Sequence, residues 1–150
     1  MKRIVIFISL ILLTGCFNKE KLMTCTSNIN NTKQNYKSDI TYNVYYKNKI
    51  VTKIVINEIY KSDDLNIINY FKESRSAIYD NYNKLYDGYS YKIQERDTRL
   101  EINTTIDYSK ANTKKMVKDK IIDKDYVDSY KNFTKVGAKT MYESIGAICK

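Results

Sequence analysis

The 150-residue chain contains no histidine, no proline and no tryptophan, and it has only four glycines. The absence of histidine excludes catalysis by imidazole bases and nearly all standard zinc sites. So few glycines also argue against a glycine-rich phosphate loop. Lysine and tyrosine are abundant instead: 26 basic residues against 17 acidic ones give a net charge of +9, and 15 residues are tyrosine. With 43% hydrophobic residues, the composition is that of one folded domain.

The N-terminal segment is typical of a secretory signal. Met1 to Arg3 form a short positive stretch, and Ile4 to Leu13 are apolar apart from Ser9. As a helix this apolar run would extend about 15 Å, at roughly 1.5 Å per residue, which is half of the ~30 Å hydrocarbon core of a bilayer. Residues 1–15 are therefore predicted to be an export signal rather than a membrane span.

This segment ends in Leu13-Thr14-Gly15-Cys16, which resembles the bacterial lipobox. The resemblance implies that the Cys16 sulfur receives a diacylglyceryl group, that cleavage follows before Cys16, and that the new amino terminus can be acylated. Two acyl chains such as palmitate on one residue meet the requirement for stable anchoring. A chance cysteine after an ordinary signal peptide is the alternative.

On this interpretation the mature chain starts at Cys16 and is lipid-anchored on the extracytoplasmic side of the cell membrane. Loss of Lys2 and Arg3 lowers the formal charge from +9 to +7. Residues 16–35 are rich in Asn, Thr, Lys and Ser, which predicts a lipidated N-terminus followed by a polar tether. Residues 36–150 are expected to form a single domain.

Cysteine usage agrees with export. If Cys16 is lipidated, Cys25 and Cys149 remain as an even pair, and such a pair in an exported protein indicates a disulfide. That bridge would tie the start of the mature chain to its end. Two free thiols are the alternative. A metal site is not expected, because the chain has no histidine and no further thiol.

A β-hairpin is predicted early in the domain. Residues 39–47 alternate between apolar and polar side chains, with one face formed by Ile40, Tyr42, Val44 and Tyr46. Residues 50–60 are rich in β-branched side chains, and Asn48-Lys49 between the two segments favours a tight turn with positive φ at Asn48. A two-residue loop would place Val44 opposite Lys53, and one further loop residue would exchange the two faces.

The hydrophobic period changes after residue 62 and predicts a helix from Asp63 to Asp87. Its apolar residues recur every three, four or seven positions and form a single stripe of Leu65, Ile68, Phe71, Ile78, Tyr82 and Leu85. Ser62 is expected to cap the start of this helix and Gly88 to end it.

The second half of the domain again has the order strand, strand, helix. Residues 89–93 and 100–108 alternate again and predict two strands joined by a turn at Arg96-Asp97. Beyond Ser109 the pattern indicates a short helix over residues 110–122 and helical turns from 126 to 145, interrupted near Gly137. The order ββαββα predicts an α+β fold, an antiparallel four-stranded sheet with helices packed on one face.

Several short motifs resemble the YehR-like family of small bacterial lipoproteins. They are the lipobox, a cysteine close to the C-terminus, Met23-Thr24-Cys25, Tyr46-Lys47-Asn48 with Val51-Thr52-Lys53, and Thr104-Thr105-Ile106-Asp107-Tyr108. The resemblance implies a lipid-anchored domain with an antiparallel sheet and helices, of uncharacterised activity, and it transfers no catalytic residue. Residues 134–148 depart from the Glu-rich helix expected for this family.

No group of residues forms a recognisable catalytic motif. Without histidine, a lysine-activated serine is the remaining nucleophile, and neither Ser109-Lys110 nor Ser129-Tyr130-Lys131 has the Ser-x-x-Lys spacing at a helix start. Helix-dipole compensation and solvated turns explain the clustered acids Asp63, Asp64, Asp123, Asp125 and Asp128. We therefore expect no enzyme, no catalytic residue and no cofactor, with a non-histidine hydrolase as the outside alternative.

The positive charge predicts a binding role. Lysine supplies most of it, so base-specific contacts from arginine are scarce, and export separates the chain from nucleic acid. The expected partners are the membrane through the diacylglyceryl anchor, an anionic lipid or wall polymer, or an envelope protein. An AT-rich gene would produce the same enrichment in Lys, Asn, Ile and Tyr without any such role.

Most tyrosines are expected in the core, at strand positions such as Tyr89 and Tyr91. Tyr45, Tyr60 and Tyr79 are candidates for exposed rings that stack on a ligand. The chain is thus interpreted as a lipid-anchored lipoprotein that serves as a binding or envelope-interaction module. A small-ligand-binding accessory lipoprotein of a transport system is the alternative.

Overall fold

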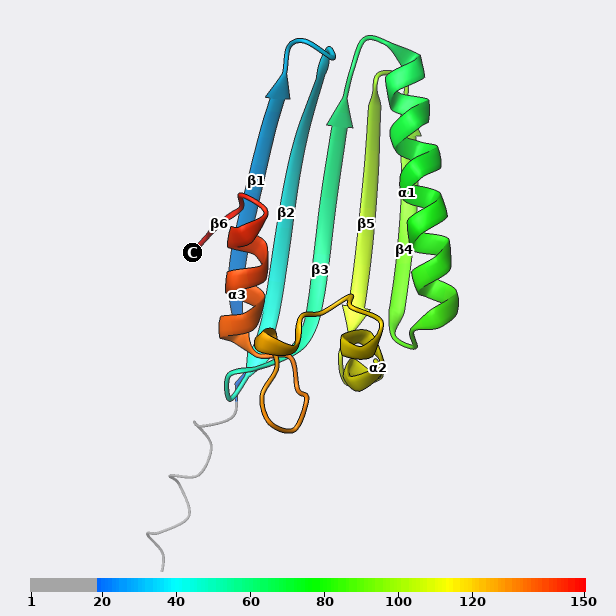
Figure 1. The fold of residues 1–150 in the computed structure, drawn as a ribbon. Helices are drawn as coiled ribbons and strands as arrows, with labels where there is room; N and C mark the ends of the chain where they lie inside the picture. Colours follow the sequence, from blue (N-terminus) through cyan, green and yellow to red (C-terminus); the bar gives the residue numbers. More distant parts are fainter. Residues whose placement is uncertain (1–18) are drawn as a thin grey trace, which may run out of the picture.

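The computed structural model describes residues 19–150, which form a six-stranded antiparallel sheet and three α-helices (Figure 1). The strands are β1 (Lys21–Asn31), β2 (Tyr36–Lys47), β3 (Ile50–Lys61), β4 (Tyr89–Arg96), β5 (Arg99–Asp107) and β6 (Ile148–Cys149). The helices are α1 (Leu65–Leu85), α2 (Thr113–Lys118) and α3 (Lys135–Ser144), with a 3₁₀ turn η1 at Lys124–Tyr126. Across the sheet the order is β4-β5-β3-β2-β1-β6.

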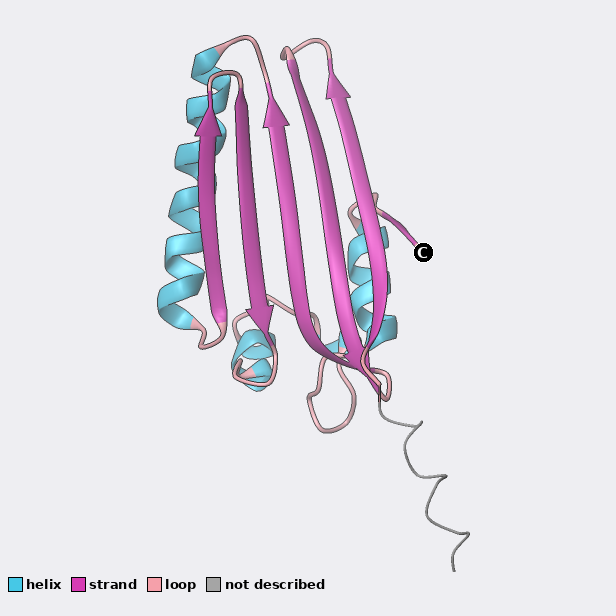
Figure 2. Ribbon diagram, turned by 180° about the vertical axis from the view of Figure 1, so that it is seen from behind, coloured by secondary structure: helices cyan, strands magenta, loops and turns pink. Residues whose placement is uncertain are grey.

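α1 and α3 lie on one face of the sheet. Seen from behind, the long strands stand in front of these two helices, and α2 lies beyond the ends of the strands (Figure 2). α1 packs against β3, β4 and β5, and α3 packs against β2, β3 and β6. No other element of residues 19–150 covers the opposite face, which carries Lys37, Thr41, Asn57 and Asn103 and is called the open face below.

The prediction of a four-stranded sheet in ββαββα order is wrong, because two strands lie outside the predicted set. β1 occupies residues that were expected to form the polar tether, and β6 forms from the end of the chain. β1 is hard to recognise in the sequence because Met23 and Cys25 are its only buried residues. Most of its other side chains are Thr, Ser and Asn, which are also typical of linkers.

β2 and β3 form the predicted hairpin around Asn48-Lys49, where φ is 50° and 69°. A bulge follows Tyr45, and it inserts one extra residue into β3. As a result Val44 lies opposite Ile54 rather than opposite Lys53. The bulge lets a two-residue turn coexist with a register in which both apolar side chains are fully buried.

α1 is shorter than predicted by two residues at each end. Its N-cap is Asp64 and not Ser62: the Asp64 carboxylate accepts a hydrogen bond from the backbone N–H of Asn66. The buried residues of the helix are Ile68 and Tyr79. Three residues of the predicted stripe are exposed instead, namely Leu65, Ile78 and Leu85.

The C-terminal helices also differ from the prediction. α2 covers only residues 113–118, and the chain leaves it at Asp119 before a positive φ of 60° at Lys120. α3 continues through Gly137, where a break was predicted. A Cβ atom at Gly137 would lie 2.1 Å from the carbonyl oxygen of Tyr126, so glycine allows the helix to approach η1 closely.

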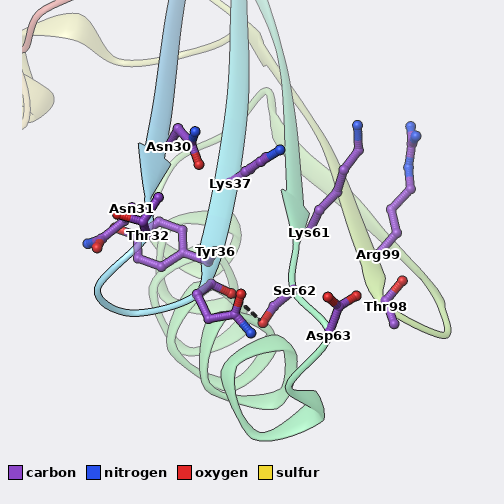
Figure 3. Close-up of a pocket in the computed structure, with 11 residues that line it drawn as sticks. Asn30, Asn31, Thr32, Tyr36, Lys37, Lys61, Ser62, Asp63, Thr98 and Arg99 are labelled. Carbon is purple, nitrogen blue, oxygen red and sulfur yellow. Dashed lines mark hydrogen bonds between the residues drawn. The ribbon is translucent and has the colours of Figure 1, made fainter.

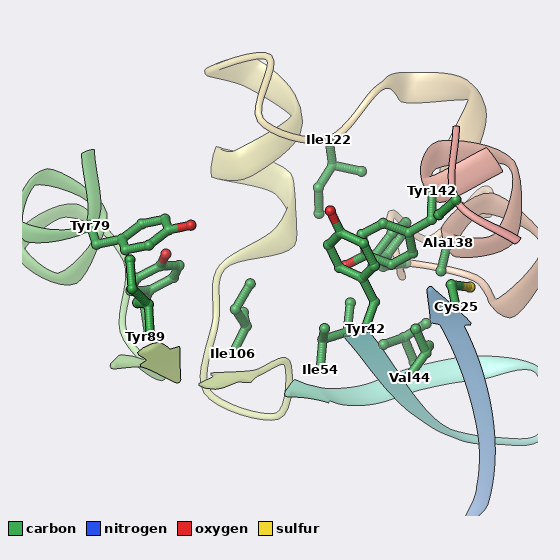
Figure 4. Close-up of a cluster of buried hydrophobic side chains, with 14 of the residues drawn as sticks. Cys25, Tyr42, Val44, Ile54, Tyr79, Tyr89, Ile106, Ile122, Ala138 and Tyr142 are labelled. Carbon is green, nitrogen blue, oxygen red and sulfur yellow. The ribbon is translucent and has the colours of Figure 1, made fainter. Parts of the chain in front are cut away.

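The core lies between the sheet and the helices and contains aromatic clusters under α1 and α3 (Figure 4). Under α3, the Tyr42 and Tyr142 rings stack with centroids 4.1 Å apart. Under α1, the centroids of Tyr79 and Tyr89 are 6.1 Å apart. Ile54 on β3 lies between these clusters in the same core (Figure 4).

The predicted disulfide between Cys25 and Cys149 is confirmed. The two cysteines are paired residues of β1 and β6, so the bridge fastens the end of the chain to the first strand. They are 124 positions apart. Closing so long a loop stabilises a fold by about 4–5 kcal/mol in the chain-entropy model.

The described chain begins at Lys19, next to the start of β1, at the end of the sheet where α2 lies (Figure 1). The predicted signal segment and the lipidation residue Cys16 lie outside the described residues. Within residues 19–150, no helix combines the length and the apolar character needed to cross a membrane.

Candidate binding site

The open face of the sheet presents rows of hydrogen-bonding side chains. Residues that oppose each other on neighbouring strands share a face, and one such row is Thr26, Thr41, Asn57 and Asn103. The Asn57 amide donates to the Asn103 side-chain oxygen at 2.9 Å. In the adjoining row the hydroxyl of Thr24 donates to the Asn43 side-chain oxygen at 3.0 Å. These rows offer polar contacts, and the apolar side chains of Val55 and Ile59 lie on the same face.

One row of the open face is basic. Lys37 on β2 lies opposite Lys61 on β3, Lys61 lies opposite Arg99 on β5, and Arg99 lies opposite Arg96 on β4. These four residues, called the basic row below, cross four neighbouring strands with no acid between them. Like charges directly opposite each other destabilise a sheet. The arrangement is therefore unfavourable unless nearby acids or a ligand offset the repulsion.

The basic row borders a pocket at the end of the sheet. The pocket has a volume of about 630 Å³, and its lining includes Lys37, Lys61 and Arg99, with Asp63 as its one acid. Figure 3 shows the three basic side chains extending to the same side of the sheet. A neighbouring pocket of about 240 Å³ also contains Arg99 and adds Arg96. The row thus lines two neighbouring hollows that share Arg99.

The turns that form this pocket are fixed to one another. The Ser62 hydroxyl donates to the carbonyl oxygen of Asn35 at 2.7 Å, drawn as a dashed line in Figure 3. It also accepts a hydrogen bond from the backbone N–H of Asp64 at 3.1 Å. The ring of Tyr36 packs edge-on against Phe71, with centroids 5.0 Å apart. The β1–β2 turn, the end of β3 and the start of α1 therefore support the pocket together.

Two carboxylates balance the inner members of the basic row. Asp39 lies 3.9 Å from Lys61, and Glu101 lies 3.1 Å from Arg99. Hydrogen bonds from Asn103 and Arg99 hold the pKa of the Glu101 carboxyl below its usual value, so this carboxyl is ionised. Among the described residues, the two outer members of the row have no ion-pair partner. These outer cations are available to a ligand.

A second charged cluster lies on the helix-covered face and is buried. Glu58 on β3 is 3% exposed and accepts hydrogen bonds from the hydroxyls of Tyr60, at 2.5 Å, and Tyr79. The Arg75 Nε on α1 lies 3.4 Å from the Glu58 carboxylate and donates to the Tyr60 hydroxyl at 3.0 Å. Burial, and then the Glu58 charge, raises the pKa of both tyrosines. The cluster joins α1 to β3 and has a structural role.

The residues singled out in the sequence do not gather at one site. The prediction that Tyr60 and Tyr79 are exposed is wrong. Their side chains are 2% and 8% exposed, because their hydroxyls donate hydrogen bonds to the buried Glu58. Tyr45 lies on the open face, where the Lys53 ammonium is 4.3 Å from its ring centroid. The disulfide cysteines lie at the β1–β6 edge and line neither of these hollows.

The acids of the 123–128 segment cap turns. Asp123 accepts a hydrogen bond from the Asp125 N–H at 2.9 Å, and Asp128 accepts from the N–H groups of Tyr130 and Asn132 at 2.9 and 2.8 Å. Within residues 19–150, no three His, Cys, Asp or Glu side chains come close enough to hold a metal ion.

The basic row escapes sequence reasoning because its members are far apart along the chain. Arg96 and Arg99 flank a predicted turn, so their pairing could have been inferred. Lys37 and Lys61 become neighbours only because β2 starts at Tyr36, before the predicted start of that strand at Asp39. Extending the register outward from the two-residue turn would pair Lys37 with Tyr60. The bulge after Tyr45 is what brings Lys61 opposite Lys37.

The fold has counterparts among solved structures. The chain is similar to the YehR protein of E. coli, with a TM-score of 0.58 and 22% identity over 88% of this chain and 91% of that one. The chain has a YehR-like fold. A protein from Streptococcus pneumoniae TIGR4 resembles it with a TM-score of 0.51 and 14% identity, over 100% of this chain and 96% of that one. No protein-family model and no curated protein sequence matches the chain.

Proposed function

We propose that this protein is a lipid-anchored extracytoplasmic lipoprotein that binds an anionic wall polymer through its basic row. The anchor is the expectation raised by the lipobox at Cys16. The observation that carries the binding function is the row of four like charges on neighbouring strands. Like charges on opposing residues are unfavourable for folding, and such unfavourable local features are expected at functional sites.

The orientation of the sheet favours a wall polymer over a lipid headgroup as the partner of this row. β1 has eleven residues and extends roughly 35 Å at about 3.3 Å per residue. The basic row lies near its far end, where Lys37 pairs with Asn30. Lys21 is five positions after Cys16, a reach of at most about 18 Å. An anchor at Cys16 therefore holds the domain by the opposite end and presents the row away from the membrane.

The chemistry of the row fits a chain of phosphates. Its members follow neighbouring strands about 4.8 Å apart, so the row spans roughly 14 Å. Arginine binds a phosphate through two parallel hydrogen bonds, whereas lysine acts as a point charge. The adjoining Asn and Thr side chains offer hydrogen bonds to polymer hydroxyls. No catalytic step forms part of the proposal.

Binding of poly(glycerol phosphate) by the full chain tests the proposal. The Lys37→Gln, Arg96→Gln double variant should bind roughly 30-fold more weakly, because each cation near an anionic surface contributes about 1 kcal/mol and 1.4 kcal/mol is tenfold in affinity. The matched control is Lys53→Gln with Lys92→Gln, which removes the same charge from the open face outside the row. Equal losses in the two variants would contradict a specific site.

The stability of the same variants separates binding from folding. Because the row contains like charges opposite one another, the Lys37→Gln, Arg96→Gln variant should be as stable as the parent chain or slightly more stable. Glycerol phosphate monomer and inorganic phosphate serve as small-ligand controls. If they bind as tightly as the polymer, the accessory small-ligand function replaces the polymer-binding one.

A further inference from the structure

A second basic surface lies at the other end of the sheet, where the described chain begins. α2 and the loop that follows it project beyond the sheet at this end (Figure 1, Figure 2). The Val51 N–H donates to the Phe133 carbonyl oxygen at 2.9 Å, which fastens the loop to the β2–β3 hairpin. The Thr52 hydroxyl donates to the Glu20 carboxylate at 2.5 Å, which places the start of the described chain beside the same hairpin.

Lysines surround an exposed aromatic ring on this surface. Residues 110–120 contain five lysines and one aspartate. A hollow of about 560 Å³ is lined by Lys114, Val117, Lys118, Ser129, Tyr130 and Lys131. Tyr130 is 80% exposed, the highest value among the exposed large hydrophobic side chains of the described residues. A largely exposed tyrosine with lysines around it is typical of contact with a charged interface that has an apolar layer beneath it.

The loop that carries Tyr130 is fixed in place. The Asp128 carboxylate accepts hydrogen bonds from the backbone N–H groups of Asn132 and Tyr130, and these bonds lower the pKa of Asp128. Val127 and Phe133 pair as a β-bridge at the base of the loop, and Phe133 is buried. The ring of Tyr130 is thus presented by a short loop anchored to the core.

The acids near this surface are engaged elsewhere. Asp119 accepts a hydrogen bond from the Tyr86 hydroxyl at 2.9 Å, and Asp123 caps the 3₁₀ turn η1. With Asp128 directed into its own loop, the carboxylates do not pair with the lysines around the hollow. Within the described residues, Lys114, Lys118 and Lys131 form no ion pair with an acid.

We propose that Lys114, Lys118, Tyr130 and Lys131, together named the anchor-end surface, dock on the anionic headgroups of the bilayer that holds Cys16. The inference rests on the proposed lipid anchor. Charge complementarity and the short distance from Cys16 to the first strand favour this occupant. The lysines contact lipid phosphates while the Tyr130 ring enters the headgroup region. The contact fixes the domain upright, with its basic row facing away from the membrane.

The absence of tryptophan offers a clean reporter, since a single introduced indole is the only one in the chain. Full-length, membrane-extracted protein with Tyr130→Trp is placed in vesicles of phosphatidylcholine with phosphatidylglycerol. The indole at position 130 should shift its emission to the blue and be quenched by brominated lipid. The control is Tyr70→Trp, a residue 66% exposed on α1 at the far end of the sheet, which should show neither effect.

Charge variants in the Tyr130→Trp background complete the test. Lys114→Gln with Lys118→Gln should abolish the shift, and Lys53→Gln with Lys92→Gln should preserve it. An unchanged indole at position 130 in vesicle-anchored protein would overturn the docking surface and leave the anchor intact. If the intact mass shows no lipid on Cys16, the proposed anchor is wrong. The same vesicles, added to the unanchored chain at low salt, must then still shift the indole emission to the blue. No shift in that experiment would overturn the docking surface as well.

Discussion

Glu58 places a carboxylate between β3 and α1, where an unpaired charge would be strongly destabilising. Two tyrosine hydroxyls and the Arg75 guanidinium satisfy it. The Arg75 side chain is 33% exposed, so part of this ion pair stays in contact with water. The tyrosine hydroxyls are buried, so loss of their hydrogen bonds should lower the free energy of unfolding most.

Tyr79→Phe removes one of these hydroxyls while keeping the ring. We expect the free energy of unfolding to fall by about 1–2 kcal/mol, because a buried carboxylate loses a hydrogen-bond donor. Urea denaturation measures the loss. The control is Tyr91→Phe, whose hydroxyl donates to the exposed Asp80 at 2.6 Å and should cost less. A Tyr79→Phe protein as stable as the control would contradict the structural role of the cluster.

The buried tyrosines also predict loss of stability at high pH. Burial raises the pKa of Tyr60, Tyr79 and Tyr142 above the ordinary value of 10.0. Above pH 10 the unfolded chain therefore releases protons that the folded chain retains, and the free energy of unfolding falls as the pH rises. Tyrosinate absorbance and circular dichroism followed together check this. Ionisation of the buried rings well below the pH of unfolding would contradict it.

At the level of elements, α3 depends on a glycine near its start. Gly137→Ala should stabilise an exposed helix by about 0.5–1 kcal/mol. Here the new Cβ would lie 2.1 Å from the Tyr126 carbonyl oxygen, so we expect a clear loss of thermal stability instead. The exposed Lys139→Ala in the same helix is the control and should have little effect. Equal melting temperatures would show that α3 and η1 are not packed as described.

The elements that the sequence predicts correctly are those with a strong local pattern. The β2–β3 hairpin and α1 combine long periodic segments with turn residues such as Asn48, and their existence follows from local rules. β1 pairs with the adjacent β2, but its Thr, Ser and Asn side chains do not distinguish it from a linker. β6 escapes prediction because it forms against β1, which is distant in sequence. β6 has only two residues and depends on the disulfide of Cys149 to Cys25. Non-local pairing is the information that alternation alone does not contain.

The candidate site escapes prediction for the same reason. Lys37, Lys61, Arg96 and Arg99 belong to four strands, and each is unremarkable in its own segment. Their juxtaposition appears only when the register of three strand pairs is known. The cysteine pairing was accessible from the sequence because a count of cysteines suffices to propose it.

In the molecule as a whole, the two basic surfaces lie at opposite ends of the sheet, separated by the length of its strands. The anchor-end surface lies beside the start of the described chain, and the basic row lies at the far end of the strands. In the proposed arrangement one end docks on the membrane and the other reaches toward the wall. The disulfide and the long antiparallel strands give the domain the stiffness that such a spacer requires.

The most direct test of the central claim locates the bound polymer on the protein. Backbone amide NMR spectra of the full chain are recorded during titration with poly(glycerol phosphate). The account predicts shifts that saturate and centre on the amides around Lys37, Lys61 and Arg99, with little change around Tyr130. Shifts spread evenly over all lysine-rich segments, or centred on the anchor-end surface, would contradict a polymer-binding site at the far end of the sheet.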